Sequence, residues 1–137
     1  MNRDSNGYTF LFATAMVLVV ATTLAFTASS LKSLQEENVR KEKMQNILST
    51  IGIQTDREQA EKIYKKYITG SMALDHLGNT DETVEAFQLK LNNEIKKPVK
   101  EQRFPLYKAV VDNISYYIIP LRGSGLWDAI WGYIALK

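Results

Sequence analysis

The segment that decides the architecture is residues 8–31, which read YTFLFATAMVLVVATTLAFTASSL. No charged side chain occurs from Ser5 to Leu31. At about 1.5 Å per residue, a helix over this segment is roughly 36 Å long, which is enough to cross a ~30 Å hydrocarbon core. It is apolar around its whole circumference, which argues against an amphipathic helix of a soluble core. The sequence therefore predicts one transmembrane helix over residues 8–31.

A cleavable signal peptide is the alternative interpretation of this segment. Such a peptide has an apolar region of about 7–15 residues behind a clearly basic start. Here the apolar run is longer, and the only basic side chain before it is Arg3. The tripeptide Thr27-Ala28-Ser29 resembles a cleavage site only loosely. A retained anchor is the favoured interpretation.

The charges of the chain are concentrated after the apolar segment. The 137 residues include 17 Lys and Arg and 15 Asp and Glu, and only Arg3 and Asp4 of these precede Lys32. Acidic and basic side chains nearly balance, with a net charge of +2, so nothing indicates a nucleic-acid partner. The absence of cysteine excludes a disulfide scaffold and cysteine metal ligands. A hydrophobic content of 45% argues against disorder.

Residues 32–70 are predicted to form a helical connecting region. A helix is expected to continue out of the membrane as far as Gly52. The sequence Thr55-Asp-Arg-Glu58 fits a capping box, in which two side chains bind free amides of the first helical turn. A second helix is therefore expected after it, ending at Gly70. The apolar residues of the first helix recur at helical spacing: Leu31, Leu34, Met44, Ile47, Leu48 and Ile51.

Residues 71–137 have the pattern of an antiparallel sheet. A short strand is predicted from Met72 to Leu77. The pattern of residues 83–91 is ambiguous, and residues 92–103 are predicted to form a polar, Lys-rich connection. Leu106–Val111 and Ser115–Leu121 are β-branched and aromatic runs around Asp112-Asn113, which predicts a hairpin. Trp131–Leu136 is predicted to be a further strand. The expected fold class is α+β, one transmembrane helix followed by a helix-plus-antiparallel-sheet domain.

No catalytic residue and no metal ligand set can be assigned from the residues alone. His76 is the only histidine, and it is expected to be a surface or partly packed residue. No closely spaced His, Asp and Glu side chains suggest a metal site. Gly123-Ser-Gly125 begins like a dinucleotide fingerprint, but Asp128 stands where the third glycine is needed.

The most unusual stretch is residues 120–136, PLRGSGLWDAIWGYIAL. Its glycines permit close backbone approach, and Leu126 and Trp127 follow at once. A planar aromatic ligand is one interpretation, with glycine amides at its polar edge and Trp127 as an apolar wall. Gly125, Leu126 and Trp127 are therefore the candidate cofactor-binding residues. A tight turn with two core tryptophans is the alternative.

Four segments together carry a family resemblance, and they are LKSLQEEN (31–38), QNIL (45–48), YIIPLRGSGLW (117–127) and IWGYIAL (130–136). Behind a single N-terminal anchor, they closely resemble the C subunit of the sodium-translocating NADH:quinone oxidoreductase, the Nqr complex. The related G subunit of the Rnf electron-transport complex shares this architecture. Its glycine turn is less commonly followed by Leu-Trp, so Nqr is favoured.

The resemblance implies a subunit of a respiratory enzyme in the bacterial inner membrane, with the other Nqr subunits and membrane lipid as partners. It implies a cytoplasmic segment 1–7, the membrane helix 8–31, the connecting region 32–70 and, from residue 71, an extracytoplasmic domain of the FMN-binding type. In that family, FMN is joined by a phosphoester to a threonine in Ser-Gly-Ala-Thr-x-Ser/Thr and relays electrons. The whole complex passes electrons from NADH to ubiquinone and exports Na⁺.

The sequence departs from the family in one respect. No Ser-Gly-Ala-Thr motif is present, so no threonine here receives the attachment role. The chain is therefore expected to be the N-terminal part of a protein like the Nqr C subunit, truncated before that motif and inactive alone. A second hypothesis is a non-enzymatic membrane protein with one membrane pass and a structural or interaction domain.

Charge and resemblance disagree about orientation. The flank after the anchor holds Lys32, Arg40, Lys41 and Lys43, against Arg3 before it. The positive-inside rule would place the large domain in the cytoplasm. Acidic side chains are mixed into that flank, so the predicted orientation follows the family, with the domain outside.

Overall fold

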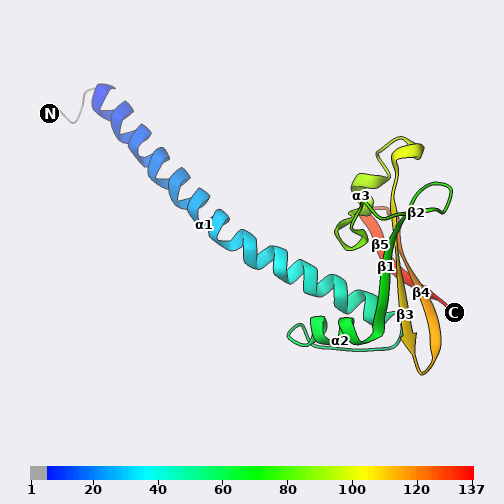
Figure 1. Cartoon of the computed structure of the whole chain (residues 1–137). Helices are drawn as coiled ribbons and strands as arrows, with labels where there is room; N and C mark the ends of the chain where they lie inside the picture. Colours follow the sequence, from blue (N-terminus) through cyan, green and yellow to red (C-terminus); the bar gives the residue numbers. More distant parts are fainter. Residues whose placement is uncertain (1–5) are drawn as a thin grey trace. The chain divides into compact units, whose positions relative to one another are not determined.

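The computed structural model describes residues 6–137, which form the element order shown in Figure 1. The chain divides into two compact units, residues 1–40 and residues 41–137. Helix α1 (Asn6–Ser49) contributes most of its length to the first unit and its last residues to the second.

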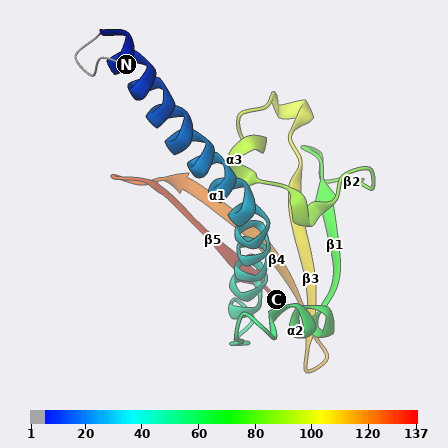
Figure 2. The same cartoon turned by 90° about the vertical axis from the view of Figure 1, so that its left-hand side faces the viewer.

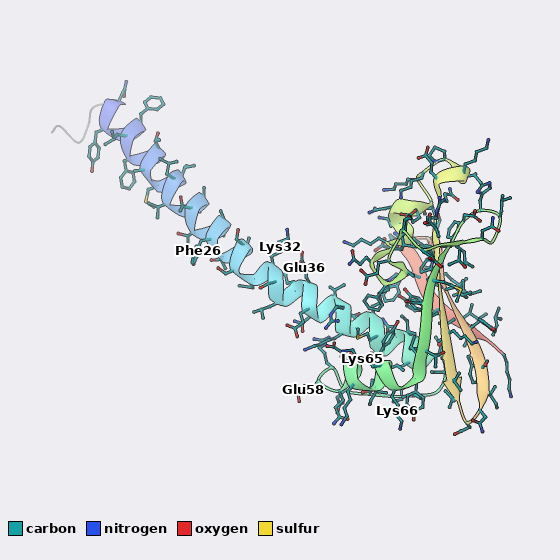
Figure 3. All side chains as sticks on the ribbon, viewed as in Figure 1. Phe26, Lys32, Glu36, Glu58, Lys65 and Lys66 are labelled. Carbon is teal, nitrogen blue, oxygen red and sulfur yellow. The ribbon has the colours of Figure 1, made fainter. Side chains whose placement is uncertain are left out.

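The first part of α1 is long and apolar enough to cross a membrane. Several threonines and serines lie in it, and their hydroxyls bind carbonyls one turn earlier. Thr22 donates to Leu18 at 2.7 Å, and Thr27 donates to Thr23 at 2.9 Å. These intrahelical hydrogen bonds satisfy the hydroxyl donors without water, as a lipid environment requires. Figure 3 labels Phe26 in the apolar part of α1 and, further along the same helix, the charged residues Lys32 and Glu36.

The predicted stop of the first helix at Gly52 is confirmed. After Ser49 the chain turns, and Gly52 has a φ of +80°. Its N–H donates to Ser49 O, and the N–H of Ile53 donates to Leu48 O, both at 3.1 Å. This pair of bonds is a Schellman motif, in which the residue with positive φ is usually glycine.

The predicted capping box is wrong. Helix α2 (Ala60–Tyr67) begins after a turn, and no side chain caps it. The carbonyl of Thr55 instead accepts a bond of 2.7 Å from the Gln45 amide, which holds residue 55 against α1. The predicted helix end at Gly70 is also wrong, because strand β1 (Ile68–Leu74) has begun before it and shifts register between Ile68 and Gly70.

Five antiparallel strands form one sheet in the order β2-β1-β3-β4-β5. The other strands are β2 (Thr80–Asp81), β3 (Phe104–Val111), β4 (Ile114–Ser124) and β5 (Ala129–Leu136). Short helices η1 (Ala86–Gln88), α3 (Leu91–Glu94) and η2 (Val99–Glu101) lie between β2 and β3. The α+β prediction is confirmed, although the strand expected at Met72–Leu77 runs from Ile68 to Leu74.

The predicted hairpin around Asp112-Asn113 is confirmed. Both residues have positive φ, 50° and 63°. Two consecutive positive φ values at a two-residue turn are those of type I′, whose twist matches that of the flanking strands. The turn brings Val111 opposite Ile114 and Tyr107 opposite Ile118.

The core lies on one face of the sheet, which we call the inner face. Tyr107, Ala109 and Ile118 of that face are fully buried together with Ile47 of α1. The partly buried residues against this core are Ile51, Tyr64, Ile68, Phe87, Tyr116, Tyr133 and Ala135. Figure 2 looks onto the inner face, with α2 in front of the strands. The end of α1, α2 and η1 thus form one helical layer over one face of the sheet.

Candidate functional site

The turn between β4 and β5 holds the predicted cofactor-binding residues. Ser124 and Ala129 are the last paired residues, so residues 125–128 form the turn. The N–H of Gly125 donates to Asp128 O at 3.0 Å. A Cβ at Gly125 would lie 2.3 Å from that same oxygen and 2.9 Å from Cγ1 of Ile130. Residue 125 is therefore glycine because the two sides of the turn approach closely.

Leu126 and Trp127 occupy the tip of this turn and point into solvent. Their exposed fractions are 92% and 96%. The alternative of two core tryptophans is therefore wrong, since Trp131 is also 57% exposed. The tight turn itself is as expected.

These three residues do not enclose a flavin by themselves. The amide of Gly125 is engaged within the turn, so it is not free for the polar edge of a ligand. The indole of Trp127 is almost fully exposed, which leaves it able to serve as one wall of a site completed by other residues. The assignment of Gly125, Leu126 and Trp127 to a flavin region stays a prediction.

A second cluster, on the inner face, was missed from the sequence. Lys43 of α1 donates to the carbonyls of Phe87 and Leu89, and its ammonium lies 4.6 Å from the ring centroid of Phe87. Burial, and then the charge of Lys90, lower the pKa of Lys43 from 10.5 to about 8. The sequence feature that indicates this burial is the position of Lys43 one helical turn before Ile47, which is a core residue.

Tyrosines surround the same cluster. The rings of Tyr64 and Tyr107 both meet Phe87 edge-on, at centroid distances of 5.7 and 6.4 Å. Burial raises the pKa of Tyr64 and of Tyr107 well above the ordinary value, and it raises the pKa of Tyr133 to about 12. These side chains are therefore neutral packing groups, and Tyr64 and Tyr107 hold η1 in place through Phe87.

Two carboxylates hold the segment between β2 and β3. Asp81 accepts hydrogen bonds from the Thr83 hydroxyl and from Nε of Arg103, at 2.5 and 2.6 Å. These bonds lower the pKa of Asp81 to about 2. The buried Glu94 accepts bonds from Lys97 Nζ at 2.8 Å and from the backbone N–H of Arg103 at 3.1 Å. Every partner of these carboxylates belongs to the loop itself, which marks a structural role.

The single histidine of the chain lies at the surface. His76 is exposed in the turn after β1, as predicted. Within residues 6–137, no group of three His, Cys, Asp or Glu side chains is arranged to hold a metal ion.

Comparisons with known proteins point to one family. No family model matches the chain. Curated relatives named as the C subunit of Na(+)-translocating NADH-quinone reductase do match, among them those of Yersinia pestis and Neisseria meningitidis serogroup B, at 24% and 25% identity. The alignments cover 98% and 99% of this chain and 58% and 59% of those relatives. The chain thus spans about three fifths of the length of the curated relatives it matches.

A solved structure agrees with these relatives. The crystal structure of the C subunit of Na(+)-translocating NADH-quinone reductase from Parabacteroides distasonis superposes with a TM-score of 0.71 and 31% sequence identity. The match covers 78% of this chain and 51% of that chain. This chain is therefore similar to the C subunits of the Na(+)-translocating NADH-quinone reductases, in sequence along nearly its whole length and in fold over 78% of it.

Proposed function

We propose that this chain is a membrane-anchored component of a sodium-translocating NADH:quinone oxidoreductase. The observation that carries the proposal is the match to curated C-subunit sequences over 98% or more of the chain, with the same fold in the Parabacteroides protein. The assembled enzyme would pass electrons from NADH toward ubiquinone and couple this transfer to Na⁺ export. The chain alone would be inactive.

The proposed cofactor of the assembly is FMN, held in the extracytoplasmic domain, where it would supply one-electron chemistry. Gly125, Leu126 and Trp127 are proposed to border the flavin region. Trp127 supports this, since its indole is exposed at the tip of a turn shaped by Gly125. The remaining walls, and the attachment threonine, would come from residues other than these.

The proposed location is the bacterial inner membrane, with residues 8–31 as the anchor in lipid. The apolar part of α1 supports this, because its hydroxyls are bonded within the helix. The N-terminus is proposed to be cytoplasmic and the domain periplasmic. Trypsin added to inside-out membrane vesicles should then leave the domain intact, whereas trypsin added to spheroplasts should digest it. Digestion in the vesicles alone would reverse the orientation.

Membership of the complex is tested by affinity purification. The tagged full chain, solubilised from membranes of its own host in a mild detergent, should bring down the other Nqr subunits, identified by mass spectrometry. A control chain in which residues 8–31 are replaced by an unrelated membrane helix separates binding by the domain from binding by the anchor. Recovery of no Nqr subunit, or of Rnf subunits instead, would contradict the proposal.

Flavin fluorescence tests the cofactor region. In the purified complex, Trp127→Ala should increase flavin fluorescence, since a nearby indole quenches an excited flavin. Trp131→Phe is the matched control and should leave the fluorescence unchanged. A fluorescent band of the denatured, washed 137-residue chain would contradict the expectation that the attachment residue lies elsewhere. A complex without any flavin would favour a structural or interaction role for the domain.

A further inference from the structure

One segment holds the excess positive charge of the chain. Residues 90–103 contain five Lys and Arg and two Glu, a net charge of +3. The whole chain has a net charge of +2, so the remaining residues together carry −1. Two cations of the segment are neutralised, since Lys97 pairs with the buried Glu94 at 2.8 Å and Arg103 pairs with Asp81 at 2.6 Å. The free positive charge therefore belongs to the other lysines of the segment.

Lys96 and Lys100 carry free charge at the surface. Both are exposed, and neither forms an ion pair among residues 6–137. Lys90 is exposed as well, and it lies close to Lys43 of α1. The exposed acid of the segment is Glu101. The lysines outnumber it, which leaves this stretch of surface positive and suited to an anionic partner.

Apolar side chains lie beside these lysines. Ile95 is 48% exposed and Val99 is 63% exposed, so residues 95–100, IKKPVK, present basic and apolar side chains together. None of these six residues is buried or acidic. An acidic protein surface would bind the ammoniums but would offer nothing to the apolar side chains. A lipid surface accepts both, because anionic headgroups attract lysine while apolar side chains enter the boundary of the acyl region.

The turn after strand β1 lies at the same end of the sheet. Leu74 is paired with Phe104, so the residues after β1 and those before β3 leave the sheet together (Figures 1 and 2). Leu77 in that turn is 73% exposed. The turn is held in shape by Asp75, whose carboxylate accepts bonds of 2.8 Å from the N–H groups of Leu77 and Asn79. We call this surface the basic end, and it consists of Leu77, Ile95, Lys96, Val99 and Lys100.

The chain itself keeps this surface near a membrane. Residues 32–40, roughly 14 Å of helix at about 1.5 Å per residue, connect the apolar part of α1 to the second unit. A weak contact is sufficient for a domain tethered in this way, because it meets the bilayer at a high effective concentration. We propose that the basic end docks on the anionic headgroups of the bilayer that α1 crosses. This inference rests on the proposed membrane location, and not on electron transfer.

A label at position 99 tests the contact. The chain has no cysteine, so Val99→Cys in the full chain accepts a single thiol-reactive fluorophore. The labelled chain is placed in nanodiscs that contain a nitroxide-labelled lipid, which quenches a fluorophore at the bilayer surface. Quenching should be about tenfold greater in phosphatidylglycerol discs than in phosphatidylcholine discs, and high salt should remove the difference. Lys137→Cys, which places the label at the opposite end of the sheet, should show little quenching in either lipid.

Two charge reversals of equal size separate the basic end from general attraction. Lys96→Glu combined with Lys100→Glu should lower quenching at position 99 to its value in phosphatidylcholine. Lys62→Glu combined with Lys66→Glu makes the same change of charge on exposed residues of α2 and should leave quenching unchanged. Circular dichroism of both variants should match that of the unchanged chain, because none of these lysines belongs to the core. Equal quenching in the two variants would contradict the assignment of the surface.

Other results would overturn the proposal. Equal quenching in the two lipids would mean that the headgroup charge is not recognised. Quenching that is absent, together with a loss of Nqr subunits from the pull-down of the Lys96→Glu and Lys100→Glu chain, would make the partner an acidic protein surface. A chain that enters the discs without quenching at position 99 would remove the docking and keep the anchor. A chain that does not enter the discs would remove the anchor and the docking together, so the two failures are distinguishable.

Discussion

The sheet has an inner face, on which the helices of residues 41–137 pack, and an opposite, outer face, on which they do not, although both faces are built from the same strands. On the inner face, Tyr107 is fully buried between strands and helices. On the outer face, Tyr117 is 41% exposed, and the ammonium of Lys108 lies 6.0 Å from its ring centroid. Strands that are apolar on both sides are typical of sheets buried on both faces.

The comparison separates the face of the sheet that the helices of this unit stabilise from the face that stays exposed. On the inner face the helices pack against the core, the ring of Tyr107 contacts Phe87, and Lys43 donates a hydrogen bond to the carbonyl of Phe87. The packing of this face therefore already contributes to stability. The outer face contributes its apolar surface only when another layer covers it. Matched substitutions on the two faces should therefore have unequal effects on folding.

The largest difference is expected between two tyrosines. Tyr107→Ala removes a buried ring in contact with Phe87 and a hydrogen bond of 3.4 Å to Ala86 O. It should lower the free energy of unfolding by about 3–5 kcal/mol. Tyr117→Ala, on the outer face, should cost less than about 1 kcal/mol. Urea unfolding of the full chain in a mild detergent, followed by near-ultraviolet circular dichroism, measures both.

Equal losses of unfolding free energy in Tyr107→Ala and Tyr117→Ala would contradict the difference between the two faces. A large cost for Tyr117→Ala would mean that the outer face is already covered in the isolated chain.

Hydrophobic patterning and turn chemistry predicted much of the fold. The apolar segment 8–31 is part of the 44 residues of α1, and Asp112-Asn113 gives the expected hairpin, because both signals depend on neighbouring residues alone. The capping box at Thr55 failed because a tertiary bond from Gln45 holds that residue. The boundary at Gly70 failed because glycine there accompanies an irregularity in strand pairing rather than a helix end.

The candidate site was less predictable than the fold. The sequence pointed to Gly125 as a close-approach glycine, and the turn bears that out. It did not reveal that the partner in that approach is Asp128 O, nor that Trp127 is exposed. The burial of Lys43 depends on η1, which lies about 40 residues further along the chain. Such contacts depend on tertiary packing, which local patterns do not encode.

A smaller difference is expected between two glycines. Gly52 has a φ of +80°, with open space where a Cβ would lie, so Gly52→Ala strains only the backbone. It should cost about 1–2 kcal/mol at the end of the helix that covers the inner face. Gly132 of β5 has open space for a Cβ and no positive φ. Gly132→Ala should therefore be neutral or stabilise by up to about 1 kcal/mol in the same urea measurement.

If Gly132→Ala cost more stability than Gly52→Ala, the two faces would differ in their backbone and not only in their packing. A neutral Gly52→Ala would mean that the Schellman motif does not limit stability. A destabilising Gly132→Ala would mean that another backbone approaches β5 closely in the isolated chain.

The smallest effect expected is a pH dependence that arises on the inner face. In the folded chain Lys43 has a pKa of about 8, below its ordinary 10.5, chiefly because it is buried. Between these values the unfolded chain binds more protons than the folded chain, so stability should rise with pH from about 8 to about 10. Partial exposure of the ammonium limits the gain to roughly 1 kcal/mol. Above about pH 10 stability should fall, since Tyr64, Tyr107 and Tyr133 have raised pKa values and ionise more readily when unfolded.

Unfolding free energies measured at intervals of about one pH unit from neutral pH to about pH 11 test this profile. Lys43→Met should remove the rise above about pH 8 and keep the fall above about pH 10, because the tyrosines remain. Lys108→Met, the matched change on the outer face, should keep both the rise and the fall of stability with pH. A rise that survives in Lys43→Met would assign the titration to another group. A profile lost in both variants would mean that the pH dependence is not specific to the inner face.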